Sequence, residues 1–217
     1  MTINLGEKNS ILNQFVSEIR DVNIQKDRMR FRRNIERIGE IMAYEISKTL
    51  NFSEKEITTP LGEANMHLPT DDLVIGCILR ASLPLHQGFL NYFDKADNTF
   101  ISAYRKHHKD GSFEVEVEYL SSPNLDGKTL ILVDPMLATG QSMALSYEAM
   151  LQKGTPKITH FVSVIASQEG VDKIQNMMPN NSRLWVAAID DELTAQAYIV
   201  PGLGDAGDLA FGEKVDN

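Results

Sequence analysis

The segment from Asp134 to Ser142, with the sequence DPMLATGQS, carries residue types that suit an anion-binding loop. It follows an apolar run and would place small residues at the start of a helix. Backbone N–H groups there are unsatisfied and partly positive, and Thr139 and Ser142 could add hydroxyl donors. The Asp134 carboxylate would repel phosphate but could accept hydrogen bonds from sugar hydroxyls. The segment does not match the Walker pattern of nucleotide-binding loops. Local chemistry therefore leaves two interpretations open, a ribose-phosphate site or a capped helix after a tight turn.

Other polar residues stand at or just past the ends of apolar runs, as Asp134 does. They are Arg80, Tyr104–Arg105 and Asp190. Because ligands of open α/β sheets bind beyond the carboxyl ends of the strands, we expect these residues to face one site. Arginine stays charged and offers a fork of donors, which suits a diphosphate, although a structural salt bridge is the alternative for each arginine.

The histidines give weaker signals. His107 and His108 lie in the polar segment KHHKDG, which is typical of a solvated turn. His67, His86 and His160 lack the spacing of metal ligands or acid–base pairs. We therefore assign no chemistry to them.

A helix is predicted over residues 28–50, because apolar side chains recur there at helical spacing. They are Phe31, Ile35, Ile38, Met42, Ile46 and Leu50. Five arginines of this segment could form a basic patch, although a solvated face or a subunit contact is the favoured interpretation. They are Arg28, Arg30, Arg32, Arg33 and Arg37.

Beyond that helix, buried strands alternate with helices. Strands are predicted at 72–79, 99–105, 113–120, 128–134, 158–167 and 183–190, and helices at 82–93, 140–154 and 169–179. The alternation over 113–120 predicts that Phe113, Val115, Val117 and Tyr119 share one face, and the KDG turn before it predicts a hairpin with 101–108. The order indicates an α/β fold, a parallel sheet flanked by helices on both faces with an inserted β-hairpin.

Composition narrows the classes of function. The 217 residues carry a formal net charge of −9, which counts against nucleic acid or an anionic membrane surface as a general partner. The lone cysteine, Cys77, cannot form an internal disulfide and lies in an apolar run, so we expect a buried small hydrophobe and a reducing compartment. No segment has the length and apolarity of a membrane span or a signal peptide, so we expect a cytoplasmic protein.

Four segments together resemble one family. DPMLATGQS resembles the phosphoribosyl-diphosphate loop of type I phosphoribosyltransferases, and in its DPMLATG form that of the uracil phosphoribosyltransferase family. YIVPGLGDAGDLAFG at 198–212 resembles that family's uracil-binding segment. ILRASLPLHQG at 78–88 and the YR pair at 104–105 are similar to two further stretches, in the family's order. The similarity extends over nearly the whole chain.

The resemblance implies a type I phosphoribosyltransferase-like domain over residues 1–217. It implies N-terminal helices at about 10–50, a hairpin arm at about 100–121 and a C-terminal base-binding hood at about 190–212. The implied reaction converts uracil and 5-phospho-α-D-ribose 1-diphosphate (PRPP) to UMP and diphosphate. Mg²⁺ is the implied cofactor, held mainly by substrate oxygens rather than by protein ligands. A homodimer or homotetramer and activation by GTP are further expectations.

The resemblance also implies roles for individual residues. Arg105 and Asp205 would be catalytic, and uracil would contact Ile199, Gly204, Asp205 and Ala206. The residues implied to bind PRPP are Arg80, Arg105, Asp134, Pro135, Met136, Leu137, Ala138, Thr139, Gly140, Gln141, Ser142 and Asp205.

The chain departs from the family pattern at two of these segments. Gln141 stands where a second glycine is usual, and Ser82 replaces the glycine after Arg80–Ala81. A left-handed backbone at Gln141 would crowd the loop, so we expect Gln141 in the first helical turn with its side chain outward. Two alternatives remain, a nucleotide-sensing RNA-binding regulator with the same fold and a transferase for another nucleobase. The acidic charge opposes the first, and the absence of a cation in 198–212 opposes orotate.

Overall fold

The computed structural model describes residues 1–107 and 113–214, and its main feature is a sheet in the order β1-β10-β9-β7-β4-β5-β6. Neighbouring strands along this order are parallel, except that β6 is antiparallel to β5. The strands of this sheet are β1 (Thr2–Asn4), β4 (Leu73–Leu79), β5 (Asp97–His107), β6 (Phe113–Ser121), β7 (Thr129–Val133), β8 (Met136–Leu137), β9 (Ile158–Ser167) and β10 (Arg183–Asp190). The predicted parallel sheet is therefore confirmed, and the structure adds β1 at one edge.

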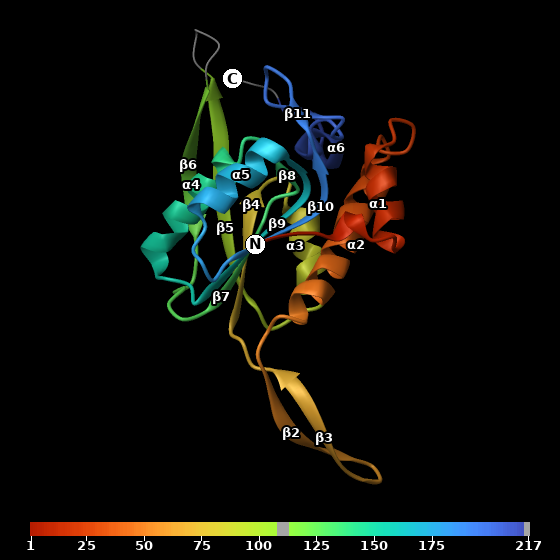
Figure 1. Ribbon diagram of the computed structural model, residues 1–217, viewed down its shortest axis with the longest axis vertical. Coiled ribbons are helices and arrows are strands. Elements are labelled where there is room, and N and C mark those ends of the chain that lie inside the picture. The colour runs from red at the N-terminus through yellow and green to blue at the C-terminus, as the bar shows by residue number, and fades with distance from the viewer. Residues whose placement is uncertain (108–112, 215–217) are drawn as a thin grey trace.

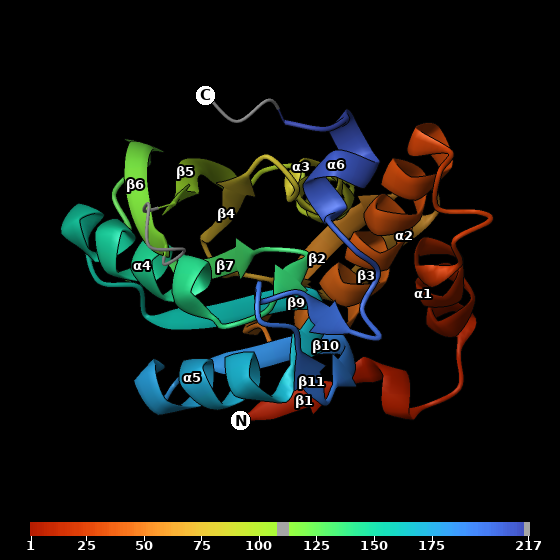
Figure 2. The same ribbon diagram turned by 90° about the horizontal axis from the view of Figure 1, so that it is seen from above.

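Helices cover both faces of this sheet (Figures 1 and 2). The helices are η1 (Leu5–Glu7), α1 (Ile11–Arg20), α2 (Arg28–Ser47), α3 (Leu83–Leu90), α4 (Gln141–Met150), η2 (Leu151–Lys153), α5 (Gln168–Met177) and α6 (Ala206–Phe211). Side chains of β7 alternate between two cores: Ile131 and Val133 pack with α1, α2, α3 and α6, whereas Leu130 and Leu132 pack with α4 and α5. Both faces of the strand are thus apolar, as expected of a buried parallel strand.

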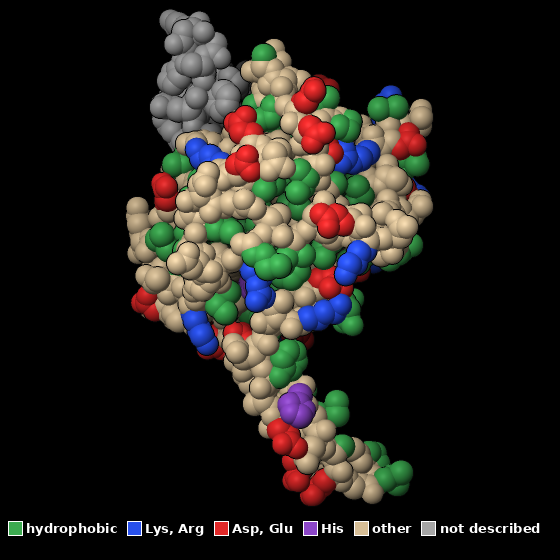
Figure 3. All heavy atoms as spheres, in the orientation of Figure 1, with side chains coloured by type: hydrophobic (Ala, Val, Ile, Leu, Met, Phe, Trp, Pro, Cys, Tyr) green, Lys and Arg blue, Asp and Glu red, His purple; other side chains and the backbone are tan. Residues whose placement is uncertain are grey.

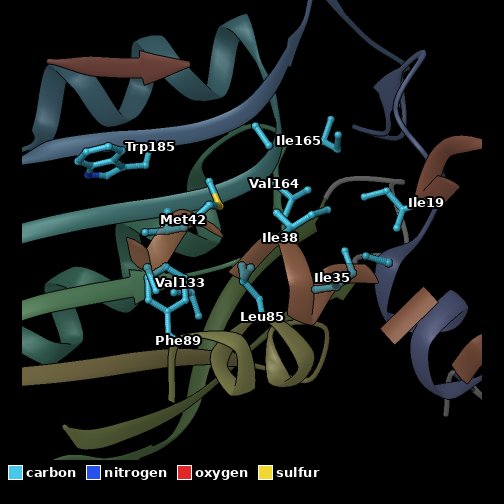
Figure 4. Packing of buried hydrophobic residues seen from close by; sticks show 14 of the residues in the cluster. Ile19, Ile35, Ile38, Met42, Leu85, Phe89, Val133, Val164, Ile165 and Trp185 are labelled. Atoms are coloured by element: carbon cyan, nitrogen blue, oxygen red, sulfur yellow. The ribbon is translucent and has the colours of Figure 1, made fainter. Parts of the chain in front are cut away.

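Helix α2 supplies much of the first core, as its periodicity predicts. Ile35, Ile38 and Met42 lie against Val133 and neighbouring residues of the sheet and of α3 (Figure 4). The arginines of α2 make individual contacts instead of one patch; Arg30, for example, binds Glu18 of α1 at 2.9 Å. Two further donors to that carboxylate are Gln14 and Asn34, and the three hydrogen bonds lower the pKa of Glu18 to about 2.

The hairpin of β5 and β6 forms as predicted, but its alternation is interrupted. A β-bulge pairs Ser102 with Tyr119 and the next residue, Ala103, with Val117, so Glu118 is an extra residue on β6. A bulge shifts the faces of a strand by one residue. Val117 and Leu120 consequently pack on the core, whereas Tyr119 is 55% exposed. The prediction that Tyr119 shares a face with Val117 was wrong, and the predicted KDG turn lies outside the described residues.

A second hairpin has no counterpart in the predictions. Strands β2 (Phe52–Thr59) and β3 (Gly62–Pro69) pair with each other and extend away from the rest of the molecule (Figure 1). Their charged and apolar residues do not alternate clearly, and nearly all of them are exposed. Among the described residues, no helix is long and apolar enough to cross a membrane.

Candidate active site

The loop after β7 is shaped by its backbone. Asp134 donates its N–H to Val162 O at 3.0 Å and accepts a hydrogen bond from Met136 N at 3.3 Å through Oδ1. Met136 and Leu137 form β8, which pairs with the end of β9. Gly140 then has φ 74° and precedes α4, with no side-chain cap on the helix. The N-terminus of α4 is therefore open toward this loop, as an anion site requires.

Gln141 is placed as predicted. The left-handed residue is Gly140, and Gln141 is the first residue of α4. The Gln141 side chain accepts a hydrogen bond from Lys173 Nζ of α5 at 2.7 Å, and its backbone N–H donates to Thr139 Oγ1 at 3.4 Å. Gln141 therefore does not have to adopt the left-handed backbone conformation, which Gly140 takes instead.

Arg80 lies at the turn between β4 and α3. Its Nη2 donates to Asp208 Oδ1 at 3.1 Å and to Gly212 O at 2.5 Å, so the turn contacts the C-terminal segment. Ser82 precedes α3 as predicted, but its buried hydroxyl makes no helix-capping hydrogen bond. Since β4 is paired directly with β7, the turn that holds Arg80 and the loop that holds Asp134 lie at the same end of adjacent strands.

Tyr104 and Arg105 lie inside β5, not just past its end. β5 continues beyond its last residue paired with β4, Ser102, and pairs there with β6. The backbone of Arg105 stands opposite Val115 in this extension.

The C-terminal segment is a loop followed by a short helix. Ile199 lies in β12 (Ile199–Val200), which pairs with β11 (Glu192–Leu193), and it is buried. Gly204 has φ 96°, and a Cβ built there would meet no atom within 4 Å. Asp205 caps α6 by accepting a hydrogen bond from Asp208 N at 2.9 Å, and Ala206 is buried. The four predicted uracil contacts therefore come from one loop with a left-handed turn, which suits recognition by backbone groups.

Several residues that fasten this loop were not predicted. Arg20 of α1 pairs with Asp190 through two hydrogen bonds of 2.8 Å and donates to Gly202 O at 2.9 Å. Gly202 N donates in turn to Asp190 at 2.8 Å. Gln25 donates to Leu203 O at 3.1 Å. Asp190, predicted to face the site, instead holds the loop.

The ionisation of Asp190 supports this structural role. Burial alone would raise the pKa of its carboxyl. The hydrogen bonds from Arg20 and Gly202 outweigh burial and hold the pKa below its ordinary value. Arg32 of α2 also holds the C-terminal segment, at α6. It donates to Ala210 O at 2.7 Å, and its guanidinium carbon lies 5.9 Å from the ring centre of Phe211.

Three further titratable groups named from the sequence, Cys77, His86 and His160, are buried and have structural roles. Cys77 is buried, and burial raises the pKa of its thiol to about 12, so it is unreactive. His86 is buried and contacts Asn98 Oδ1 through Nε2 at 2.7 Å. His160 accepts a hydrogen bond from Trp185 Nε1 at 3.0 Å in the core. The side chains of His107 and His108 lie outside the described residues.

Comparison with known proteins agrees with this geometry. The sequence profile of the family described as uracil phosphoribosyltransferase matches residues 7–213. The chain is 57% identical over 213 residues to the uracil phosphoribosyltransferase of Porphyromonas gingivalis, covering 98% of this chain and 99% of that protein. It is 37% identical to the enzyme of the same name from Pyrococcus furiosus, covering 96% and 89%.

Solved structures show the same architecture. The AQ2163 protein of Aquifex aeolicus superposes with a TM-score of 0.87 at 27% identity and full coverage of both chains. A phosphoribosyltransferase of Corynebacterium diphtheriae matches with a TM-score of 0.52 at 13% identity, covering 83% of this chain and 96% of that one, which shows the fold alone. The profile match and the two relatives establish that the chain belongs to the uracil phosphoribosyltransferase family, and the solved structures agree with it in fold.

Proposed function

We propose that the protein transfers the phosphoribosyl group of PRPP to N1 of uracil, forming UMP and diphosphate. The observation that carries this proposal is the position of Arg80, whose turn lies at the same end of the sheet as the loop after β7 and is bonded to the C-terminal segment. The loop from Asp134 to Ser142 opens onto the N-terminus of α4, and the loop from Ile199 to Ala206 offers a left-handed turn at Gly204. Arg80 contacts the segment that follows the second loop.

Each part has a chemical task in this proposal. The 5-phosphate would bind at residues 138–142, because the N–H groups at the start of a helix carry partial positive charge. The Asp134 carboxylate would accept hydrogen bonds from the ribose hydroxyls. Arg80 and Arg105 would bind the diphosphate and stabilise the charge that develops as it leaves. Catalysis would then rest on orientation and electrostatics, with no covalent intermediate on the protein.

Base choice would rest on backbone groups. Uracil presents an acceptor, a donor and an acceptor along O2, N3–H and O4. Backbone N–H and C=O groups of residues 199–206 could match that order, with the Asp205 carboxylate beside them. Cytosine reverses the pattern at N3 and at the exocyclic position, so it would leave buried polar groups unpaired.

Mg²⁺ is the proposed cofactor, and the Asp205 carboxylate is a suitable ligand for it. One oxygen of the Asp205 carboxylate caps α6, and within the described part of the chain the other has no protein partner. Carboxylate oxygens are the ligands that Mg²⁺ prefers. In this proposal the metal is held chiefly by diphosphate and ribose oxygens, with Asp205 as the carboxylate nearest to it. When bound, Mg²⁺ would neutralise charge on the diphosphate.

A homo-oligomer is also proposed, on the basis of the β2–β3 hairpin. The hairpin carries exposed apolar side chains (Figure 3). They are Phe52, Leu61, Met66 and Leu68. A two-stranded hairpin is marginally stable alone, so a second copy of the chain is the proposed support for it. We also propose GTP as an activator. A cytoplasmic location is proposed because the sequence has a single cysteine, which cannot form an internal disulfide.

Diphosphate release with five bases side by side tests the proposed reaction. Uracil should support turnover with PRPP and Mg²⁺, whereas cytosine, orotate, hypoxanthine and guanine should support little. A parallel series with GTP tests activation. Faster turnover of any other base than of uracil would contradict the proposal.

A further inference from the structure

The guanidinium of Arg80 is bound by the chain's own C-terminal segment. Its Nη2 donates to the Asp208 carboxylate and to Gly212 O. Its Nε is buried and has no hydrogen-bond acceptor among the described residues. Arg80 therefore has an internal anionic partner and one donor still without an acceptor, and an orphaned buried donor is costly.

The fold brings Asp208 to Arg80 through two features of α6. Asp205 caps the helix by binding the N–H of Asp208, which fixes Asp208 in the first turn. The residue before Asp208 in the helix, Gly207, lies beside the turn after β4: a Cβ there would be in ordinary contact with Arg80 Nε, at 3.8 Å. The side chains of Arg80 and Asp208 keep 36% and 33% of their surface exposed, so a ligand can reach the pair.

A diphosphate and the Asp208 carboxylate would need the same donors. Nη2 is already engaged by two acceptors, and the guanidinium plane is oriented toward α6. Fork-like binding of phosphate oxygens uses two nitrogens of one guanidinium edge. The diphosphate would therefore have to replace at least part of the Asp208 contact.

We propose that Asp208 is a positioning residue that competes with diphosphate for Arg80. Asp208 binds the guanidinium before PRPP binds. The contact breaks when the diphosphate binds Arg80 and forms again when diphosphate leaves. The inference rests on the proposed function of Arg80 as a diphosphate-binding group. Breaking the Arg80–Asp208 contact therefore weakens the binding free energy of PRPP and that of diphosphate by the same amount.

Removing the charge of Asp208 should tighten diphosphate binding. Asp208→Asn keeps the size of the side chain and the backbone N–H that binds the Asp205 cap. For a partly exposed ion pair, the Kd of inorganic diphosphate measured by calorimetry with Mg²⁺ should fall about three- to fivefold. KM for PRPP should fall similarly, while kcat stays level or drops because product leaves more slowly. Asp208→Glu, which retains the carboxylate, should stay near the wild type.

Two controls separate competition from a general charge effect. Glu213→Gln removes the same charge from the same segment, but Glu213 has no described contact with Arg80 and is exposed, so this variant should behave as the wild type. In an Arg80→Lys background, which lacks the fork, Asp208→Asn should change the diphosphate Kd less than it does in the wild type. Asp208→Ala serves if the asparagine variant does not fold.

The outcomes distinguish this inference from the proposed function. A wild type that turns over uracil and binds diphosphate, with Asp208→Asn matching Glu213→Gln, would overturn the role of Asp208 alone. An equal effect of Asp208→Asn in the wild type and in the Arg80→Lys background would also overturn it. A wild type that binds neither inorganic diphosphate nor PRPP would overturn the proposed function, and the inference with it.

Discussion

At the scale of single residues, a left-handed glycine stands at each of the two proposed substrate loops. Gly140 precedes α4, and Gly204 lies in the C-terminal loop. An L side chain in such a backbone conformation costs on the order of 1–3 kcal/mol. The two positions therefore fix the paths along which backbone N–H groups face the site.

Gly204→Val should impair turnover more than Ala206→Val. At Gly204 the cost is conformational, because the space around a Cβ is open but φ is 96°. At Ala206 the cost is crowding of a buried position. We expect kcat/KM for uracil to fall by about 5- to 150-fold in the first variant, and the uracil-over-cytosine ratio to change little in the second. Wild-type kinetics in both variants would place base recognition elsewhere.

Thr139→Ala should weaken PRPP binding. The Thr139 hydroxyl lies in the loop before α4 and accepts a hydrogen bond from Gln141 N, which leaves its proton available to a phosphate oxygen. A lost hydrogen bond to a charged group is worth about 1.5–3 kcal/mol, so affinity should fall roughly 10- to 150-fold. Equilibrium binding of PRPP without uracil measures this, and a change confined to the KM of uracil would show that the loop has another role.

At the scale of elements, periodicity in the sequence was the dependable guide. The apolar spacing in α2 and the buried runs of β4, β7, β9 and β10 led to the correct elements. The β-bulge at Glu118 was missed because a one-residue insertion in pairing leaves no mark on an alternating pattern. The contacts of Arg20 and Gln25 with the C-terminal loop were missed because they join residues far apart in sequence. The Gln141 placement was predicted, since only glycine readily takes the left-handed position.

Arg20→Met should loosen the base loop. The change leaves the buried Asp190 carboxylate without its cation and removes the donor to Gly202 O. Loss of one partner of a buried pair costs about 3 kcal/mol. Chemical unfolding should report that loss, and the KM of uracil should rise while PRPP binding is retained. Lys26→Met, on an exposed cation nearby in sequence, is the matched control. An unchanged uracil KM would mean that the loop holds its shape without Arg20.

The β2–β3 hairpin should be needed for assembly. Phe52→Ser, Met66→Ser and Leu68→Ser together remove three exposed apolar side chains from the hairpin. Burial of such side chains contributes about 1.5–3 kcal/mol each, so the variant should sediment as a smaller species than the wild type. Met29→Ser changes a side chain that is also exposed, but on α2, and should leave assembly unaltered. A wild type that sediments as a monomer would contradict the proposed oligomer.

At the scale of the whole molecule, stability should fall as the pH drops below about 6.5. Burial and the nearby positive charge of Arg183 lower the pKa of His160 to about 4. The negative charge of Asp71 acts in the opposite direction and offsets only part of this shift. Between these pH values the unfolded state binds a proton that the folded state excludes, so the free energy of unfolding decreases. The full effect of His160 is on the order of 3 kcal/mol.

Urea unfolding between pH 7.5 and 4.5 measures this loss. Fluorescence of Trp185, the chain's one tryptophan, reports the transition, and its indole N–H is bonded to His160. His160→Gln should flatten the dependence on pH. A shallower slope should remain, because burial also lowers the pKa of His86. Equal slopes in the two proteins would show that His160 is not the group responsible.

The pairing of β1 with β10 has a consequence for synthesis on the ribosome. Thr2 lies opposite Leu184, so β1 is made long before the strand with which it pairs. The neighbouring pairs β9–β10 and β4–β7 also join distant segments. Such non-local pairing slows folding. The nascent chain therefore exposes the edge of β9 until β10 emerges, and a ribosome that stalls before Arg183 leaves an unpaired, apolar strand open to aggregation.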